Sequence, residues 1–569
     1  MPRPAASSVR SARKAANESS LFPTVDDLTR RIKAKFALTG IDPTKSLIKS
    51  PTAITTTTGT SIDRDLKEVT TSSIEAYRYY AEGINLHERG RELMAVAPLE
   101  KAVGIDPNFA LALVKLAVVH SNLGHSNLRR QYAERALQHL DRLTPRERYY
   151  IEGYYYSGQT EWLGKAIDAY KKGLDLYPDA ASSRNNLALV YLQLERYDDA
   201  ILHYEELRRR SFEFPGTYAS LAFAYASLGS FDKGQIVLEQ FLREHPDAGG
   251  AYSALGDVLL SSGKIDEAAA AYERGRELVP TNPFPQLGLH DVAALRERWA
   301  DAEAIGRKLA GTNESFSRLL GGEVLGTDAI LRGRLSEGLR LVEAAATGEG
   351  PAGSFESAIA RNFAARVLMA TGQTGQALAT AERALKDSAG RAAEWDSLAL
   401  IVEGHARLGH AGEAAKALET LTTKANALPS EREKRRVLLV NGVTALVRGD
   451  ADTALRALAA AEQRLARSFV GGPASPHAPI WFAAGEAHLA AHHDGEAAAR
   501  FQKVVDSGEL RIGSPIEFVR SLYSLGQISE RRGDRAKAGE YYRRFLRYWG
   551  DGEIDRDRVA EARRKVAGM

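Results

Sequence analysis

Apolar and small residues recur at a fixed interval of 34 residues between Ser182 and Pro280. Within each interval a small residue is followed three positions later by a bulky one, which places both on one face of a helix. A second helix carries a small residue four positions before a bulky one. Five columns advance in step, so the pattern is a repeat of paired helices. The columns are Ala188, Ala222 and Gly256; Tyr191, Tyr225 and Leu259; Tyr197, Phe231 and Ile265; Ala200, Gly234 and Ala268; and Tyr204, Leu238 and Tyr272.

The columns indicate how the two helices of a unit pack. An aromatic ring of one helix lies over an alanine or glycine of the other, so antiparallel helices can approach closely. Pro246 and Pro280 close their units, because proline lacks an amide hydrogen and restricts the residue before it. These columns resemble the tetratricopeptide repeat (TPR), whose small, aromatic and proline positions they match. The resemblance implies an all-α, right-handed superhelical solenoid of about 13 stacked antiparallel helix pairs.

The repeats divide the chain into four segments. Residues 1–63 combine an Ala-, Ser- and Arg-rich tail, a short amphipathic helix over 25–36 and a Thr-rich linker. Residues 64–280 form the regular array, whose first unit begins with a capping-box pattern at Ser72 and Glu75. Residues 281–546 continue the array in a looser register. Residues 547–569 are predicted to cap the last apolar face.

One unit is longer than 34 residues and rich in aromatic residues. Its first helix is predicted to begin at a second capping box, Thr144 and Glu147. If the spacing of the other units is applied backward from Ala166, Tyr154 falls in the small-residue column. We therefore favour a register shifted by one residue, which places Gly153 in that column. Core packing is the favoured role of the rings, although some could line a groove. The rings belong to Tyr149, Tyr150, Tyr154, Tyr155, Tyr156 and Trp162.

Composition narrows the classes of function. A hydrophobic content of 44% argues against wholesale disorder, and a net charge of +3 gives no general argument for nucleic acid or a membrane surface as partner. The absence of cysteine excludes disulfides and thiol chemistry. No apolar run reaches the roughly 18 residues that span a bilayer, and the basic N-terminus lacks the apolar stretch of a secretory signal. We therefore expect a soluble, cytoplasmic protein without membrane insertion.

The sequence contains no catalytic pattern. G-x-S-x-G, H-E-x-x-H and P-loop motifs are absent. Gly348, Gly350 and Gly353 match the dinucleotide-binding fingerprint literally, but they follow a helical run where that fingerprint needs a strand, and Pro351 lies among them. We therefore expect no enzymatic activity and no cofactor.

One cluster has the composition of a metal site. His488 and His492 are four residues apart, so both imidazoles could face one ion. Against this, His488 occupies a packing column, His492 falls at a turn, and a third ligand is unassigned. We expect no metal. The other residues of the cluster are Glu486, His493 and Asp494.

A closer resemblance covers residues 64–569. The segments LKEVTTSSIEAYRYYAEG, DPNFALALVKLAVVHSNLG and LTPRERYYIEGYYYSGQTEW look like the repeat region that bacterial signalling proteins carry behind a Ser/Thr kinase or winged-helix domain. The terminal RYWGDGEIDRDRVAEARRKV is similar to the closing segment of the same group. The chain contains no HRD, no DFG and no kinase-type glycine-rich loop, so kinase activity does not carry over.

The TPR resemblance implies a binding groove on the concave face, which the first helix of each unit lines. In the family an asparagine just before a Leu-Ala or Leu-Gly pair often bonds the ligand backbone, and Asn186 matches that position. Lys115 and Arg148 could hold a carboxylate, although the full carboxylate clamp of chaperone-binding members is not present. A solvated polar face would explain the same residues. The predicted groove residues are Asn186, Asn185, Gln193, Lys115, Asn122, Arg148, Ser220 and Asp257.

We predict a non-enzymatic scaffold for protein–protein interaction, which binds a peptide or partner domain in its concave groove in bacterial signalling. One alternative is the regulatory or sensor portion of a Ser/Thr kinase or transcriptional regulator whose effector domain is absent from this chain. Another is an enzyme with an unrecognised site between residues 281 and 480. Nucleic acid is not an expected partner, and the sequence indicates no oligomeric state.

Overall fold

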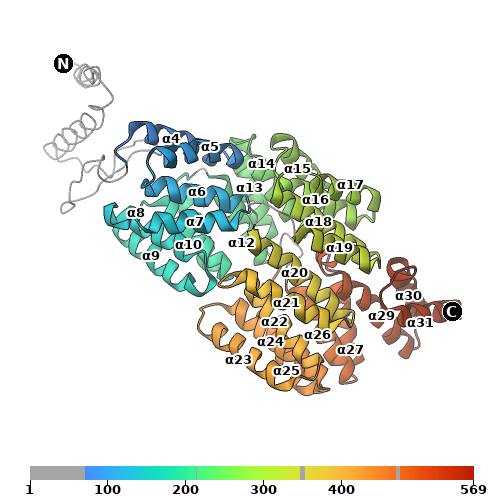
Figure 1. Ribbon diagram of the computed structural model, residues 1–569. Helices are drawn as coiled ribbons and strands as arrows, with labels where there is room; N and C mark the ends of the chain where they lie inside the picture. The colour runs from blue at the N-terminus through green and yellow to red at the C-terminus, as the bar shows by residue number, and fades with distance from the viewer. Residues whose placement is uncertain (1–70, 213, 347–352, 469–474, 569) are drawn as a thin grey trace, which may run out of the picture.

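The computed structural model describes residues 71–212, 214–346, 353–468 and 475–568. In these ranges the regular elements are all helices (Figure 1). The tail, the helix over 25–36 and the Thr-rich linker lie outside the described residues.

Thirteen helix pairs follow one another along the described chain, and consecutive helices pack together. The predicted all-α solenoid of about 13 pairs is therefore confirmed. The pairs are α4 (Ile74–Glu88) and α5 (Glu92–Ile105); α6 (Ala110–Asn122) and α7 (Ser126–Leu137); α8 (Pro145–Tyr156) and α9 (Leu163–Leu176); α10 (Ala181–Gln193) and α11 (Tyr197–Arg209); α12 (Pro215–Ser227) and α13 (Phe231–Glu244); α14 (Gly249–Ser261) and α15 (Ile265–Leu278); α16 (Pro283–Leu295) and α17 (Trp299–Ala310); α18 (Ser315–Leu331) and α19 (Leu335–Ala346); α20 (Gly353–Ala370) and α21 (Thr374–Ser388); α22 (Ala392–Arg407) and α23 (Ala411–Asn426); α24 (Glu431–Val447) and α25 (Ala451–Glu462); α26 (His477–Ala490) and α27 (Asp494–Val505); and α29 (Pro515–Arg531) and α30 (Arg535–Trp549).

Four short or terminal helices complete the fold. Two 3-10 helices, η3 (Leu140–Arg142) and η4 (Thr160–Trp162), flank α8. The short α28 (Leu510–Gly513) precedes the last pair, and α31 (Arg556–Ala567) packs on α30. Val559 and Ala562 of α31 are buried there. The helix thus covers apolar surface of the last pair.

A glycine of the first helix lies against a large side chain of the second helix in several pairs. A Cβ at Gly256 would lie 2.4 Å from the ring of Tyr272, and one at Gly153 would lie 2.5 Å from the ring of Tyr170. No side chain larger than hydrogen fits at that distance, so glycine sets how closely the helices approach. The contact between Gly153 and Tyr170 confirms the predicted one-residue slip in the third pair. The slip follows from η4, which lengthens the connection before α9.

The two predicted capping boxes have different outcomes. In α8 the Thr144 hydroxyl accepts from the Glu147 amide at 3.3 Å and the Glu147 carboxylate accepts from the Thr144 amide at 3.0 Å, so this box is confirmed. The box predicted at Ser72 and Glu75 is wrong, because the N-cap of α4 is Ser73, whose hydroxyl accepts from the Ala76 amide at 3.1 Å. The Thr71 hydroxyl accepts from the Ser73 amide at 3.2 Å and so favours this register.

The solenoid winds back onto itself, so pairs that are distant in sequence lie side by side (Figure 1). The turn between the two helices of a pair, here called the hairpin turn, contacts a segment about six pairs later. This happens in seven consecutive pairs, from the second to the eighth, and we call these contacts the inter-turn seam. It consists of His125 with Glu314, Glu161 with Lys424, Glu195 with Arg435, Ser227 with Ser468, Ser261 with Glu509, Glu297 with Tyr548, and Gly333 with Glu553.

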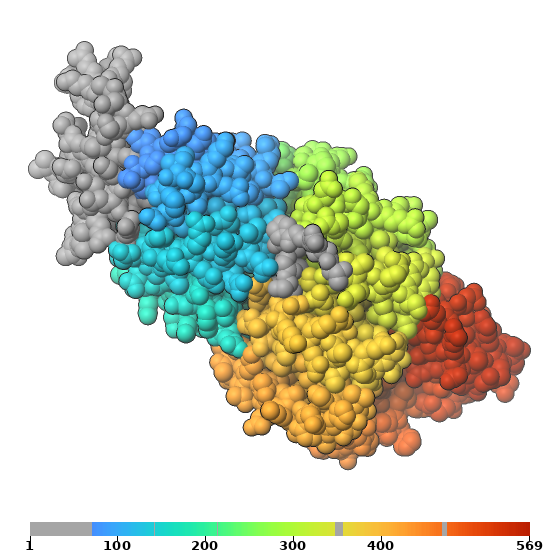
Figure 2. All heavy atoms as spheres, in the orientation of Figure 1, coloured from blue at the N-terminus to red at the C-terminus, as the bar shows by residue number. Residues whose placement is uncertain are grey.

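Because of the seam, the described chain forms about two superhelical turns that touch one another. Figure 2 shows the consequence on one face, where the teal third and fourth pairs meet the orange segment of the second superhelical turn without a gap. In the part of the chain that the structure describes, no helix combines the length and apolarity that a membrane span needs.

Candidate protein-interaction groove

The eight predicted groove residues all lie on first helices, in five consecutive pairs. Lys115, Asn186 and Ser220 hold equivalent positions, each two residues before the small residue of its helix. Between them α8 places Ile151, which is fully buried. The repeat therefore aligns three of the eight in one row with an apolar interruption. Lys115 and Asn122 lie on α6, Arg148 on α8, Asn185, Asn186 and Gln193 on α10, Ser220 on α12, and Asp257 on α14.

Two of the eight residues make strong hydrogen bonds inside the protein. Asn185 is buried, and its Oδ1 accepts from the Thr217 hydroxyl of the next pair at 2.7 Å. Asp257 accepts from the Tyr272 hydroxyl at 2.8 Å. Burial raises the pKa of Asp257 to about 6, although the hydrogen bond from Tyr272 opposes this shift. Asn185 thus ties neighbouring first helices together, and Asp257 ties the two helices of its own pair.

Two further residues bond to half-buried glutamates. The Asn122 Nδ2 donates to Glu92 at 2.8 Å, and the Arg148 Nε donates to Glu152 at 2.9 Å. Asn122 and the Arg148 side chain are exposed. Exposed contacts of this kind contribute little to stability, so a ligand could replace them at small cost.

Of the remaining four residues, three are half-buried and Gln193 is exposed. The Lys115 ammonium lies 5.8 Å from the centre of the Tyr150 ring, a cation–π distance. Asn186 faces the buried Tyr170 hydroxyl, and Ser220 faces the buried Tyr204 hydroxyl. The Asn185 Nδ2 donates to the Asn186 Oδ1 at 3.4 Å, which is a long hydrogen bond. Gln193 is exposed and makes no hydrogen bond to another described residue.

The aromatic residues of the third pair divide into two groups. Tyr150 and Tyr154 are buried, which confirms the favoured core role for them. Tyr155, Tyr156 and Trp162 are half-buried and contact one another, with ring centres 5.6 to 6.1 Å apart. This second group lies next to the seam contact between Glu161 and Lys424 rather than in the row of Asn186.

Two contacts join helix pairs that are far apart in the array, and no motif in the sequence indicates them. The ring of His87, at the end of α4, lies 5.4 Å from the ring of Phe214, at the start of α12. In the second superhelical turn the Arg520 guanidinium donates to the Ala370 carbonyl at 2.9 Å. Each contact joins pairs that are four units apart. Both superhelical turns therefore carry side-chain contacts between pairs that are not neighbours in the array.

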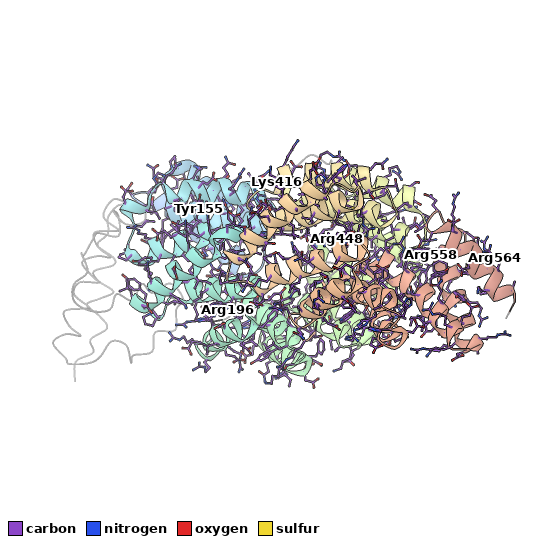
Figure 3. All side chains as sticks on the ribbon, turned by 90° about the horizontal axis from the view of Figure 1, so that it is seen from below. Tyr155, Arg196, Lys416, Arg448, Arg558 and Arg564 are labelled. Carbon is purple, nitrogen blue, oxygen red and sulfur yellow. The ribbon has the colours of Figure 1, made fainter. Side chains whose placement is uncertain are left out.

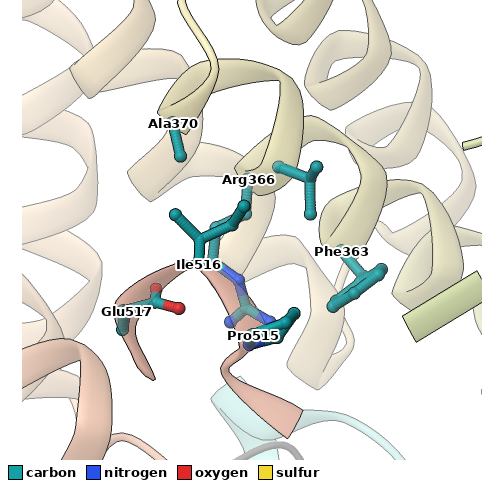
Figure 4. A pocket seen from close by; sticks show the side chains of 7 residues that line it. Phe363, Arg366, Ala370, Pro515, Ile516 and Glu517 are labelled. Atoms are coloured by element: carbon teal, nitrogen blue, oxygen red, sulfur yellow. The ribbon is translucent and has the colours of Figure 1, made fainter. Parts of the chain in front are cut away.

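Two hollows lie elsewhere. The smaller one, between α20 and α29, has a volume of about 10 Å³, which admits one water molecule at most. Figure 4 shows Arg366 and Glu517 among the residues around it. A larger cavity of about 190 Å³ lies beside α18 and α19 and has mostly apolar walls, with Ser315, Arg318 and Ser357 as its polar residues. Neither hollow includes a predicted groove residue.

The histidine cluster does not converge on one point. Helix α26 ends at Ala490, so His492 lies in the hairpin turn and not on the helix face of His488. The ring of His488 lies 5.7 Å from that of His493 instead. Among the described residues there is no group of three or more histidine, cysteine or carboxylate side chains that could hold a metal ion.

Comparison with known families identifies the repeats. One sequence model described as tetratricopeptide repeat matches residues 155–213 and 221–283, and a second with the same description matches residues 519–548. These segments are tetratricopeptide repeats. A search of curated proteins gave no match.

Two solved structures are similar to the chain. The human IFIT1 dimer with m7Gppp-AAAA is 12% identical, with a TM-score of 0.31 over 85% of this chain and 92% of that one. The APC/C hetero-tetramer Cut9–Hcn1 is 16% identical, with a TM-score of 0.31 over 87% of this chain and 99% of that one.

Proposed function

We propose that this array of tetratricopeptide repeats is a non-enzymatic scaffold that holds an extended peptide segment of a partner protein along the row of Lys115, Asn186 and Ser220. A chain of hydrogen bonds that orients Asn186 carries the proposal. The Thr217 hydroxyl donates to the Asn185 Oδ1, and the Asn185 Nδ2 donates to the Asn186 Oδ1. The Asn186 Nδ2 faces the buried Tyr170 hydroxyl and keeps a second hydrogen that can be donated to a ligand, for which a peptide carbonyl is a suitable acceptor.

A second row beside the first suits the side chains of such a peptide. Leu189, Phe223 and Asp257 hold equivalent positions in three consecutive first helices, each one residue after the small residue. Leu189 is 37% exposed and Phe223 is half-buried. Exposed apolar side chains beside fixed polar groups are typical of peptide-binding surfaces. We propose that the bound segment is extended and carries apolar side chains toward Leu189 and Phe223.

The biological setting that we propose is bacterial signalling. It rests on the resemblance of residues 64–569 to the repeat region of bacterial signalling proteins. In that setting the partner would carry the effector domain, such as a Ser/Thr kinase or a DNA-binding domain.

Selection from a display library of random peptides tests the proposal, with the full chain as bait. The best peptide is then titrated by calorimetry against wild type, Asn186→Ala and the matched control Asn426→Ala. Asn426 is exposed at the end of α23, a second helix. Loss of one hydrogen bond of about 0.5–1.5 kcal/mol should weaken binding by about 2- to 13-fold in Asn186→Ala only. Equal affinities in all three proteins, or a failure to select any peptide, would contradict the proposal.

A further inference from the structure

Two glutamates occupy backbone positions that neighbouring pairs give to glycine. In twelve of the thirteen described pairs the hairpin turn contains one residue with positive φ, and in the fifth and sixth pairs this residue is Gly229 (φ 75°) and Gly263 (φ 83°). In the fourth and seventh pairs it is Glu195 (φ 57°) and Glu297 (φ 56°). The left-handed conformation disfavours any residue with a Cβ, and glycine adopts it without strain. Each glutamate therefore bears a backbone strain that glycine at the same place does not.

Both glutamate side chains form polar contacts across the inter-turn seam. The Glu195 carboxylate accepts two hydrogen bonds from Arg435 of α24, at 2.7 and 2.8 Å. The Glu297 carboxylate accepts from the Tyr548 hydroxyl at 2.7 Å and from Arg547 at 3.3 Å, both on α30. Each glutamate thus links the first superhelical turn to the second.

His492 provides a comparison within the same chain. It occupies the equivalent place in the hairpin turn of the twelfth pair with φ 60°, so it bears the same backbone strain. That pair belongs to the second superhelical turn, and its hairpin turn makes none of the seam contacts. The His492 side chain makes no hydrogen bond or ion pair to another described residue. The chain therefore holds this strained position both with and without a seam contact.

We infer that Glu195 and Glu297 hold the two superhelical turns together and keep the coil in a closed form, which opens along the seam when these contacts are lost. The remaining seam contacts include backbone hydrogen bonds, such as the Ser468 amide to the Ser227 carbonyl at 3.1 Å. A backbone hydrogen bond of this kind requires the two superhelical turns to be aligned already. The longer side chains of Glu195 and Glu297 can make contact before the two superhelical turns are aligned. The inference concerns the shape of the whole coil, and it stands whether or not the groove binds a peptide.

The sign of a stability change tests the inference first. Glu195→Gly and His492→Gly remove the same backbone strain, but only Glu195→Gly also removes a seam contact. We expect the midpoint of thermal unfolding to rise in His492→Gly and to fall in Glu195→Gly and Glu297→Gly. A rise in all three variants would overturn the inference, because the glutamates would then be no more than strained turn residues.

A distance measurement tests whether the coil opens. The chain has no cysteine, so Asp198→Cys and Lys416→Cys place two spin labels without background. Both sites are exposed, and they lie on α11 and α23 in different superhelical turns. Figure 3 shows Lys416 in the upper part of the view and Arg196, a near neighbour of Asp198, in the lower part.

Pulsed electron spin resonance should give a narrow distance distribution in the parent protein and a longer, broader one in the Glu195→Gly, Glu297→Gly double variant. Adding His492→Gly alone should leave the parent distribution unchanged. An unchanged distribution in the double variant with full helical circular dichroism would overturn the inference. If the double variant does not fold, the single Glu195→Gly variant supports the inference by a longer distribution and contradicts it by an unchanged one.

Discussion

Arg435 and Glu195 form a two-point ion pair between residues 240 positions apart in sequence, with Nη1–Oε2 at 2.7 Å and Nη2–Oε1 at 2.8 Å. The Arg435 side chain is 3% exposed and that of Glu195 is 17% exposed. Arg435 also donates to the Arg464 carbonyl at 2.7 Å. Arginine matches a carboxylate with two parallel hydrogen bonds, so the pair fixes the relative position of α24 and the hairpin turn of the fourth pair.

Arg435→Met should lower the free energy of unfolding by about 3–5 kcal/mol, because it leaves the Glu195 carboxylate without its partner in a shielded site. Methionine keeps much of the packing of the arginine stem. Urea unfolding followed by circular dichroism measures the change. Arg196→Met is the control: Arg196 pairs with Asp199 on the surface, where such pairs contribute at most about 1 kcal/mol. A similar loss of unfolding free energy in both variants would show that the pair of Arg435 and Glu195 stabilises the protein no more than a surface ion pair.

Gly153→Ala should destabilise the third pair by about 1–3 kcal/mol, since the new methyl group would lie 2.5 Å from the Tyr170 ring and force it to move. Gly164→Ala in α9 is the matched control. A Cβ there meets nothing within 4 Å, so alanine should be neutral or stabilise the helix by up to about 1 kcal/mol. Thermal or urea unfolding should therefore show a lower free energy of unfolding in Gly153→Ala and an unchanged or higher one in Gly164→Ala. Equal changes would mean that this pair tolerates a wider helix separation.

His290 should make stability fall as the pH rises through the neutral and alkaline range. Its Nδ1 lies 2.9 Å from Asp291 and its Nε2 lies 3.0 Å from Asp328. Burial alone would lower the pKa of His290, but the hydrogen bonds to the two carboxylates raise it to about 10. An unfolded histidine has a pKa of about 6.5. The stabilisation from the charged imidazole is thus complete below pH 6.5 and lost as the pH rises to about 10.

The measurement for His290 is the free energy of unfolding across that pH window in wild type and His290→Gln. The variant should show a flatter decline, because the group that releases a proton on unfolding is gone. His410→Gln, at an exposed position, should retain the wild-type slope. The prediction fails if the free energy of unfolding declines with pH equally steeply in wild type and His290→Gln.

Glu323→Gln should stabilise the protein at neutral pH. Burial raises the pKa of Glu323 to about 7, above the value of about 4.3 for an unfolded glutamate. The folded protein therefore holds a proton in this range, and stability falls as the pH rises from about 4.3 to 7. Glutamine removes the cost of ionising the buried group, a gain of about 1–3 kcal/mol above pH 7 and none below pH 4. The free energy of unfolding of the variant and of wild type, measured below pH 4 and above pH 7, checks this prediction. Glu413→Gln, at an exposed position, is the control. A gain in stability of Glu323→Gln below pH 4 would contradict the prediction.

The repeat register of the predicted groove residues could be derived from the sequence, but their contacts could not. The repeat register puts Asn186 and Ser220 at equivalent places on first helices, and the structure shows them there. The sequence could not reveal that Asn185 bonds Thr217, because that contact depends on how α12 rotates against α10. It also could not reveal the contact between His87 and Phe214, which joins helices four pairs apart.

The sequence by itself determined the helix pairs, their number and the close contact within each pair, because these depend on residues at most a few tens of positions apart. The spacing of Gly153 and Tyr170 is such a local signal. Only the tertiary structure decided that the coil closes on itself. The meeting of Glu195 with Arg435 depends on small rotations summed over about six pairs, and no pattern within one repeat records that sum.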